Sequence, residues 1–212
     1  MCSSDLIAAD GLVPADFPFL KQLYEEDFSG LIRPLVVRSI SFLDVKEARE
    51  WVERIALHSH PLEDRISAID AIEKSGRPNA RDLILQVFQQ DPEGTLCLVC
   101  ANALGRLSPR DESIYQEFVA RFYRVDVEST KRGLLFAIAG LKIKEIPAFF
   151  IRVLLNKQYS VSLRMDALES LNIYVSNNVE TASQVEAELA SIQVEDSRLI
   201  QKLEDVLSSI SK

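Results

Sequence analysis

The chain has 212 residues, of which 47% are hydrophobic and 26% are charged, and its formal net charge is −8. This composition can bury a substantial core in one or two domains. Only seven glycines and eight prolines are present, which favours long helices joined by short turns and argues against an all-β fold. No apolar run approaches the roughly 20 residues that a membrane span needs, so we expect a soluble protein without membrane contact.

The cysteines argue against a secreted, disulfide-bonded protein. The chain has three of them, and Cys97 and Cys100 lie in an apolar helical pattern. An odd number of cysteines, two of them in an apolar helix, makes a disulfide framework improbable and fits a reducing compartment, which predicts a cytoplasmic protein.

The first six residues are set apart from the rest of the chain. The stretch from Cys2 to Leu6 resembles the translation of a sequencing-adapter tail, so residues 1–6 are interpreted as an artefact or, alternatively, as a short disordered tail. On the first interpretation the chain is a fragment of a larger bacterial protein, assembled from environmental sequence.

An internal repeat is the strongest signal in the sequence. Four segments combine a short apolar pair with a second apolar pair one turn later, and their last members are Ile72, Leu104, Ile138 and Leu171. These residues are 32, 34 and 33 positions apart. The i, i+1, i+3, i+4 spacing marks the broad buried face of a helix, and a period of this length indicates stacked helix pairs.

Each of these helices is followed by a turn and a second apolar helix. In the unit after Leu104, for example, the core pairs of the second helix are predicted to be Phe118-Val119 and Phe122-Tyr123. Second helices are expected at residues 79–90, 111–124, 145–157 and 180–192, a poorer pair at 31–42 and 44–59, a lone second helix at 15–27, and a terminal amphipathic helix at 197–210.

The repeats resemble a known family. Asp64-Arg65 before Ala68, the stretch Ala101-Asn-Ala-Leu-Gly105, and Arg164 before Ala167 resemble the first helix of HEAT repeats of the phycobilisome-lyase type. The unit around Ile138 has no arginine at the matching place. The resemblance implies an all-α fold, a right-handed α-solenoid of about five HEAT-like helix pairs. Residues 7–27 would be a partial N-terminal repeat, 28–192 the repeat array and 193–212 a C-terminal capping helix.

The residues that could carry chemistry favour structural roles. Cys97 and Cys100 form a Cys-x-x-Cys without a second ligand pair, and His58 and His60 lie beside acidic residues in a link between helices. Asp64 could cap or charge-complement the next helix. No glycine-rich phosphate loop, serine elbow or HExxH motif occurs. We therefore predict no catalytic, cofactor-binding or metal-binding residues and no cofactor.

The predicted function is a non-enzymatic scaffold that binds a protein or an acidic peptide through its concave face. In HEAT solenoids that face is lined by the second helix of each pair, and aligning these helices brings one outward position into register. The partner-binding ladder and its neighbours are Arg54, Gln86, Tyr115, Arg121, Arg124, Arg152 and Lys157. Arginine suits this role because its planar fork pairs with carboxylates at two points.

Two alternatives remain open. Residues 121–164 hold nine bases against three acids, which is compatible with an anion-binding or nucleic-acid-binding module. A DNA glycosylase-like HEAT enzyme is the enzymatic alternative. The net charge of −8 counts against both DNA-binding readings, because neutralisation of phosphates drives such affinity.

Overall fold

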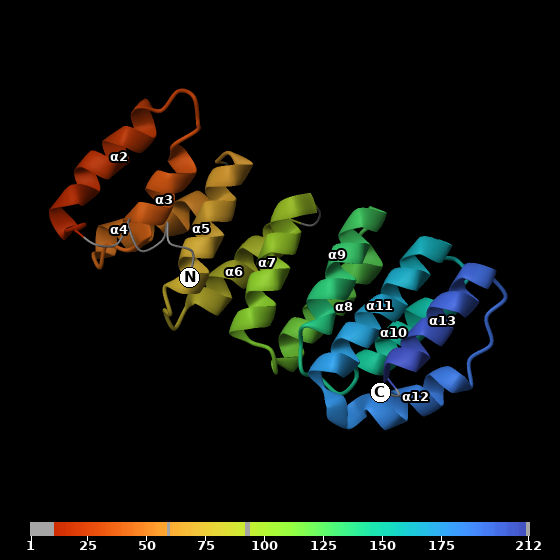
Figure 1. Cartoon of the computed structure of the whole chain (residues 1–212). Helices are drawn as coiled ribbons and strands as arrows, with labels where there is room; N and C mark the ends of the chain where they lie inside the picture. Colours follow the sequence, from red (N-terminus) through yellow and green to blue (C-terminus); the bar gives the residue numbers. More distant parts are fainter. Residues whose placement is uncertain (1–10, 59, 92–93, 211–212) are drawn as a thin grey trace. The chain divides into compact units, whose positions relative to one another are not determined.

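The structure, a computed structural model, describes residues 11–58, 60–91 and 94–210. The interpretation of residues 1–6 lies outside this range. All regular structure in the described part is helical, which confirms the predicted all-α class. The helices are η1 (Pro14–Asp16), α2 (Phe17–Glu26), α3 (Arg33–Ser41), α4 (Lys46–Leu57), α5 (Leu62–Lys74), α6 (Ala80–Gln90), α7 (Gly94–Leu107), α8 (Glu112–Arg124), α9 (Glu128–Ala139), α10 (Ile146–Leu155), α11 (Val161–Asn177), η2 (Val179–Thr181), α12 (Ala182–Ala190) and α13 (Ser197–Ile210) (Figure 1).

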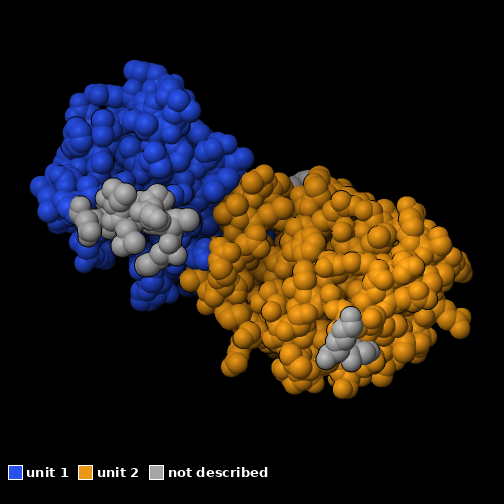
Figure 2. Space-filling model, in the orientation of Figure 1, with its two compact units in different colours: residues 1–91 blue, residues 92–212 orange. Residues whose placement is uncertain are grey.

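The chain divides into two compact units (Figure 2). Unit 1 is Met1–Asp91 and unit 2 is Pro92–Lys212, so the division falls between α6 and α7. None of the described helices combines the length and the apolar character that a membrane-spanning segment requires.

Each unit is built from two kinds of helix. In unit 2 the first helices of the pairs, α7, α9, α11 and α13, pack on one another in chain order, and α8, α10 and α12 are the second helices (Figure 1). In unit 1 the first helices α3 and α5 pack together, and α2, α4 and α6 are the second helices. The repeat residues Ile72, Leu104, Ile138 and Leu171 are all buried on the first helices.

A basic side chain on the first helix holds the end of the second helix before it. Arg33 Nε donates to the carbonyl of Tyr24 at 3.2 Å, and Arg65 Nε donates to the carbonyl of Ala56 at 3.0 Å. Carbonyls in the last turn of a helix have no partner within the helix and carry the negative end of its dipole. A cationic side chain that donates to these carbonyls therefore supplies the missing hydrogen bond and places a positive charge at the negative end of the dipole.

The same contact recurs in unit 2 with one change of residue type. Arg164 Nε donates to the carbonyl of Leu154 at 2.6 Å, and Lys131 Nζ donates to the carbonyl of Phe122 at 2.9 Å. Lys131 thus fills the place at which the sequence pattern shows no arginine. In the first helix of unit 2 the place 32 residues after Arg65 is occupied by Cys97, which is fully buried.

The first helices α7 and α9 approach closely at a glycine. A Cβ atom added at Gly133 of α9 would lie 2.5 Å from the side chain of Leu98 on α7. A Cβ added at Gly105 of α7 would meet its nearest atoms only at 3.8 Å. Gly133 is therefore needed for the close approach of Leu98, whereas the space beside Gly105 is unfilled.

We expect Arg164→Met to destabilise unit 2 by about 1–3 kcal/mol, because a buried carbonyl loses its charged donor. Urea denaturation followed by circular dichroism measures this. Arg152→Met is the matched control at an exposed arginine and should change stability by less than about 0.5 kcal/mol. If both substitutions lowered the free energy of unfolding equally, the hydrogen bond from Arg164 to the carbonyl of Leu154 would not stabilise the fold.

The two glycines give a second prediction. Gly105→Ala should stabilise the fold by about 0.5–1 kcal/mol, because alanine is the better helix former and its methyl group has room. Gly133→Ala should be less stable than wild type, because the methyl group displaces Leu98. Thermal unfolding of both variants ranks them, and a Gly133→Ala protein as stable as Gly105→Ala would contradict the close approach.

Candidate functional site

The structure exposes only part of the predicted ladder. In unit 1, Arg54 on α4 and Gln86 on α6 are exposed. In unit 2, Arg124 at the end of α8, Arg152 on α10 and Lys157 after α10 are exposed. Tyr115 and Arg121 are buried, with 3% and 7% of their surface accessible.

The prediction that Arg121 faces outward is wrong. The buried residues of α8 are Ile114, Tyr115, Phe118, Arg121 and Phe122, and their spacing of three and four marks one stripe of the helix. Arg121 follows Phe118 by three residues and so lies on the core side. The sequence alignment assumed Phe122-Tyr123 as a core pair, but Tyr123 is 51% exposed. The true rotation of α8 exchanges the roles of Arg121 and Tyr123.

Aromatic contacts join α8 to α10. The rings of Phe122 and Phe149 are 5.3 Å apart at their centroids, and those of Tyr123 and Phe149 are 6.2 Å apart, both edge to face. The Tyr115 hydroxyl points at the carbonyl of Glu145 at 3.5 Å. Burial raises the pKa of Tyr115, and the nearby Arg152 guanidinium partly opposes this. Arg152 of α10 is therefore near Tyr115 of α8.

These residues form a mixed basic and apolar surface, which we call the α8–α10 surface: Tyr123, Arg124, Arg152 and Leu155. Leu155 is 47% exposed, and neither arginine makes an ion pair within the part of the chain that the structure describes. Lys157 differs, because its Nζ is already paired with Glu195 at 3.0 Å. Two uncompensated guanidinium groups beside exposed apolar side chains can bind carboxylates.

Unit 1 contains a buried polar cluster, of which the sequence indicated His60 and Asp64 but not Tyr24. The Tyr24 hydroxyl on α2 donates to Asp64 Oδ2 at 2.7 Å, and it lies 3.1 Å from His60 Nδ1. Because the single hydroxyl proton goes to Asp64, Nδ1 of His60 must be the donor of the second bond. Asp64 is 1% exposed and makes no N-cap hydrogen bond to α5. Of the two roles that the sequence suggested, the cap is therefore not formed, whereas Asp64 does lie in the first turn of α5, where a negative charge complements the helix dipole. Its carboxylate also accepts from Tyr24.

Aromatic and cationic groups enclose this cluster. The ring of Trp51 meets the ring of Tyr24 edge to face at 4.9 Å, and the Arg33 guanidinium lies 5.2 Å from the Tyr24 ring centroid. Burial and the hydrogen bond to Asp64 raise the pKa of Tyr24 above its usual range. Burial also lowers the pKa of His60, although Asp64 opposes that shift. These side chains tie α2 to the start of α5.

Cys97 and Cys100 of α7 are fully buried, as expected from the apolar pattern around them. His58 is exposed. Among the described residues no three His, Cys, Asp or Glu side chains lie close enough together to hold a metal ion.

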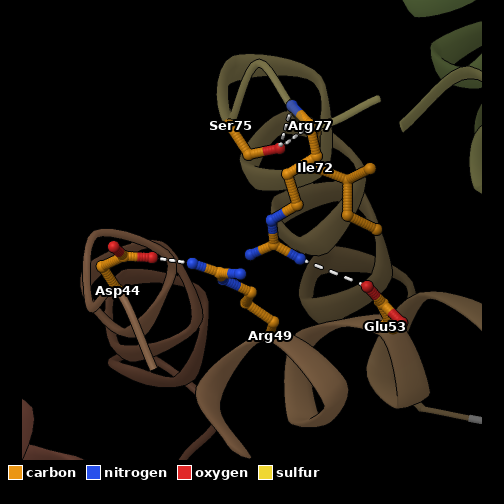
Figure 3. A network of polar contacts seen from close by, with 6 residues as sticks. All are labelled: Asp44, Arg49, Glu53, Ile72, Ser75 and Arg77. Carbon is orange, nitrogen blue, oxygen red and sulfur yellow. Dashed lines mark hydrogen bonds and ion pairs between the residues drawn. The ribbon is translucent and has the colours of Figure 1, made fainter. Parts of the chain in front are cut away.

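A second polar network ties the link between α5 and α6 to α4. Figure 3 shows the Arg49 and Arg77 side chains approaching each other between Asp44 and Glu53. Arg77 Nη1 donates to Glu53 Oε1 at 3.2 Å, and Arg49 is paired with Asp44. Burial lowers the pKa of Arg77, and Glu53 opposes that shift. Since each guanidinium already has a carboxylate, this network is a structural tie rather than an anion site.

Comparison with known proteins gives no relative from which a function could be transferred. No protein-family model, curated protein or solved structure matches the chain.

The depressed pKa of His60 predicts a pH dependence. In the unfolded chain His60 has a pKa of 6.5, so below that pH the unfolded state binds more protons than the folded state. Stability should therefore fall as the pH drops through this window. Urea denaturation between about pH 5.5 and 7.5 measures the slope. His60→Gln should flatten it. A slope that survives in His60→Gln would place its origin in another group.

Proposed function

We propose that the chain is a HEAT-like, right-handed α-solenoid that acts as a non-enzymatic scaffold in the cytoplasm. Its α8–α10 surface would bind an acidic peptide or an acidic patch on a partner protein. The observation that carries this proposal is the pair of exposed arginines, Arg124 and Arg152, which have no ion-pair partner among the described residues.

The repeated helix contacts support the solenoid. A basic residue near the start of α3, α5, α9 and α11 makes the same bond to the helix before it. Identical contacts at intervals near one repeat length are typical of arrays in which each pair packs on its neighbours. Buried free thiols at Cys97 and Cys100 fit the reducing environment of the cytoplasm.

The chemistry of the α8–α10 surface supports an acidic partner. Guanidinium groups bind carboxylates through two parallel hydrogen bonds, and exposed Tyr123 and Leu155 add apolar area beside them. Arg121 and Tyr115, which are both buried on α8, would position this surface by packing rather than contact the partner directly. Arg54 and Gln86 are exposed in unit 1, and their part in binding remains a prediction.

The alternatives are an anion or nucleic-acid binding module and a DNA glycosylase-like enzyme. A net charge of −8 opposes both DNA-binding readings. The salt dependence of binding separates these classes. The affinity for nucleic acid falls steeply as the salt concentration rises, whereas the affinity for a peptide bound by both apolar and ionic contacts falls less. An enzyme would in addition release bases from alkylated DNA.

Binding of a fluorescein-labelled oligo-glutamate peptide that contains leucine tests the proposal by fluorescence anisotropy. Arg124→Glu combined with Arg152→Glu should weaken binding about tenfold or more, because two attractive contacts become repulsive. The control pair Lys46→Glu and Lys74→Glu reverses two exposed cations of unit 1, outside the α8–α10 surface, and should leave the affinity within about twofold.

A labelled single-stranded oligonucleotide is the competing probe. Tighter binding of the oligonucleotide with a steep salt slope would favour the nucleic-acid module instead. Undiminished peptide binding by a folded Arg124→Glu and Arg152→Glu protein would place the acidic site elsewhere. Circular dichroism of each variant confirms that helical content is retained.

A further inference from the structure

On the outer surface of unit 2, some neighbouring first helices are bridged by ion pairs, whereas α7 and α9 are separated by a groove. Charged side chains bridge α9 to α11, where Arg132 Nε lies 2.8 Å from Asp166 Oδ2, and α11 to α13, where Lys202 pairs with Glu169. By contrast, α7 carries no acidic residue, and the one acidic residue of α9, Glu128, is paired with Arg132 of the same helix. Instead, a groove of about 350 Å³ opens between α7 and α9, lined by Asn102, Gly105, Arg106, Pro109, Phe136, Ala137 and Gly140.

The groove results from the size of the residues along the α7–α9 contact. At one end Gly133 lets the helix backbone approach Leu98 closely, so no space remains. At the other end Gly105 and Gly140 leave the volume that larger side chains would fill, and a Cβ added at Gly105 would still have room. Phe136 forms a wall and keeps 44% of its surface exposed.

One position in each first helix explains where the groove lies. Five residues after Lys131 and Arg164 stand Phe136 and Glu169, and the matching residue of α7, five after Cys97, is Asn102. Glu169 is engaged by Lys202 across the next helix pair, but Asn102 and Phe136 cannot form such an ion pair. A glycine inside a helix costs about 0.5–1 kcal/mol relative to alanine, so Gly105 keeps the groove open at some loss of stability.

Cations gather at the open end of the groove. Arg106 lines it, and the adjoining links carry Arg110 and Lys142, both exposed. The two links are held together, because the backbone N–H of Lys142 donates to the carbonyl of Pro109 at 2.6 Å. Arg110 and Lys142 make no ion pair with any residue that the structure describes. The groove between α7 and α9 is therefore bordered by positively charged side chains on two links that a backbone hydrogen bond joins.

We propose that this groove is a second interaction site, which binds a segment of a partner protein containing an aromatic or leucine side chain followed by carboxylates. The apolar side chain enters between Gly105 of α7 and Phe136 of α9, and the carboxylates meet Arg110 and Lys142. A volume near 350 Å³ has room for one large side chain and its backbone. The exposed Asn102 amide can hydrogen-bond the backbone of that segment.

This site is independent of the α8–α10 surface. It uses the first helices α7 and α9 and the links after them, whereas the proposed function uses the second helices α8 and α10. The two sites also differ in chemistry. Binding in the groove requires an apolar side chain, whereas binding at the α8–α10 surface depends mainly on Arg124 and Arg152. Each site can therefore fail without the other.

The test is a titration followed by ¹H–¹⁵N correlation spectra of the full chain. The probe is N-acetyl-Phe-Glu-Glu-amide, taken into the millimolar range. Saturable shifts are expected at the backbone amides of Gly105 and Gly140 and at the side-chain amide of Asn102. N-acetyl-Ala-Glu-Glu-amide lacks the anchor and N-acetyl-Phe-Gln-Gln-amide lacks the charge, so both should bind about threefold to tenfold more weakly.

Variants locate the contacts. Gly105→Leu should abolish the shifts at Gly140 by filling the groove, and Gly105→Ala, which is expected to be more stable than wild type, should weaken them. Arg110→Glu with Lys142→Glu should weaken binding about threefold to tenfold, whereas Arg124→Glu with Arg152→Glu should leave it unchanged.

Shifts confined to α8 and α10, or the absence of any saturable shift, would overturn the groove proposal. So would equal binding of the phenylalanine and alanine probes. Loss of the groove signal in Arg124→Glu with Arg152→Glu would show that the two surfaces are one site, contrary to the proposal.

Discussion

A hydrogen bond from a basic side chain to the last turn of the preceding helix sets the geometry on which the rest of each unit depends. Arg33, Arg65, Lys131 and Arg164 all make it, and each bond joins a first helix to the second helix before it in the chain. The carbonyls at a helix end need a donor, and a cation is the donor that the helix dipole favours. Cys97 stands at the corresponding position in α7, where unit 2 begins.

Because these bonds fix where each second helix ends, they also fix which of its residues reach the surface. Lys131 holds α8 at the carbonyl of Phe122, and its ammonium lies 5.0 Å from the centroid of the Phe122 ring. Phe122 in turn packs on Phe149 of α10. With the ring of Phe122 held inside, Tyr123 and Arg124 are left facing solvent. The proposed partner-binding surface is thus a consequence of the helix-end contact.

Polar groups inside the units connect helices. Tyr24, His60 and Asp64 form a chain of hydrogen bonds between α2 and α5, and Arg77 with Glu53 joins the α5–α6 link to α4. A buried carboxylate such as Asp64 is tolerated because a hydroxyl donates to it. The two surfaces proposed to bind partners instead offer Arg124 and Arg152, and Arg110 and Lys142, which make no ion pair with the described residues.

The sequence by itself determined the helices and most of the core, because a period of 32 to 34 residues and the i, i+3, i+4 spacing are local properties. It located α13 at Ser197–Ile210 and identified Ile72, Leu104, Ile138 and Leu171 as buried. Only the tertiary structure decided that Arg121 is buried and Tyr123 exposed, since neighbouring residues differ by 100° around a helix and apolar pairs do not resolve that rotation. It also decided the contact between Tyr24 and Asp64, 40 residues apart, and the groove between α7 and α9. Both depend on how separate helices pack, which no local pattern records.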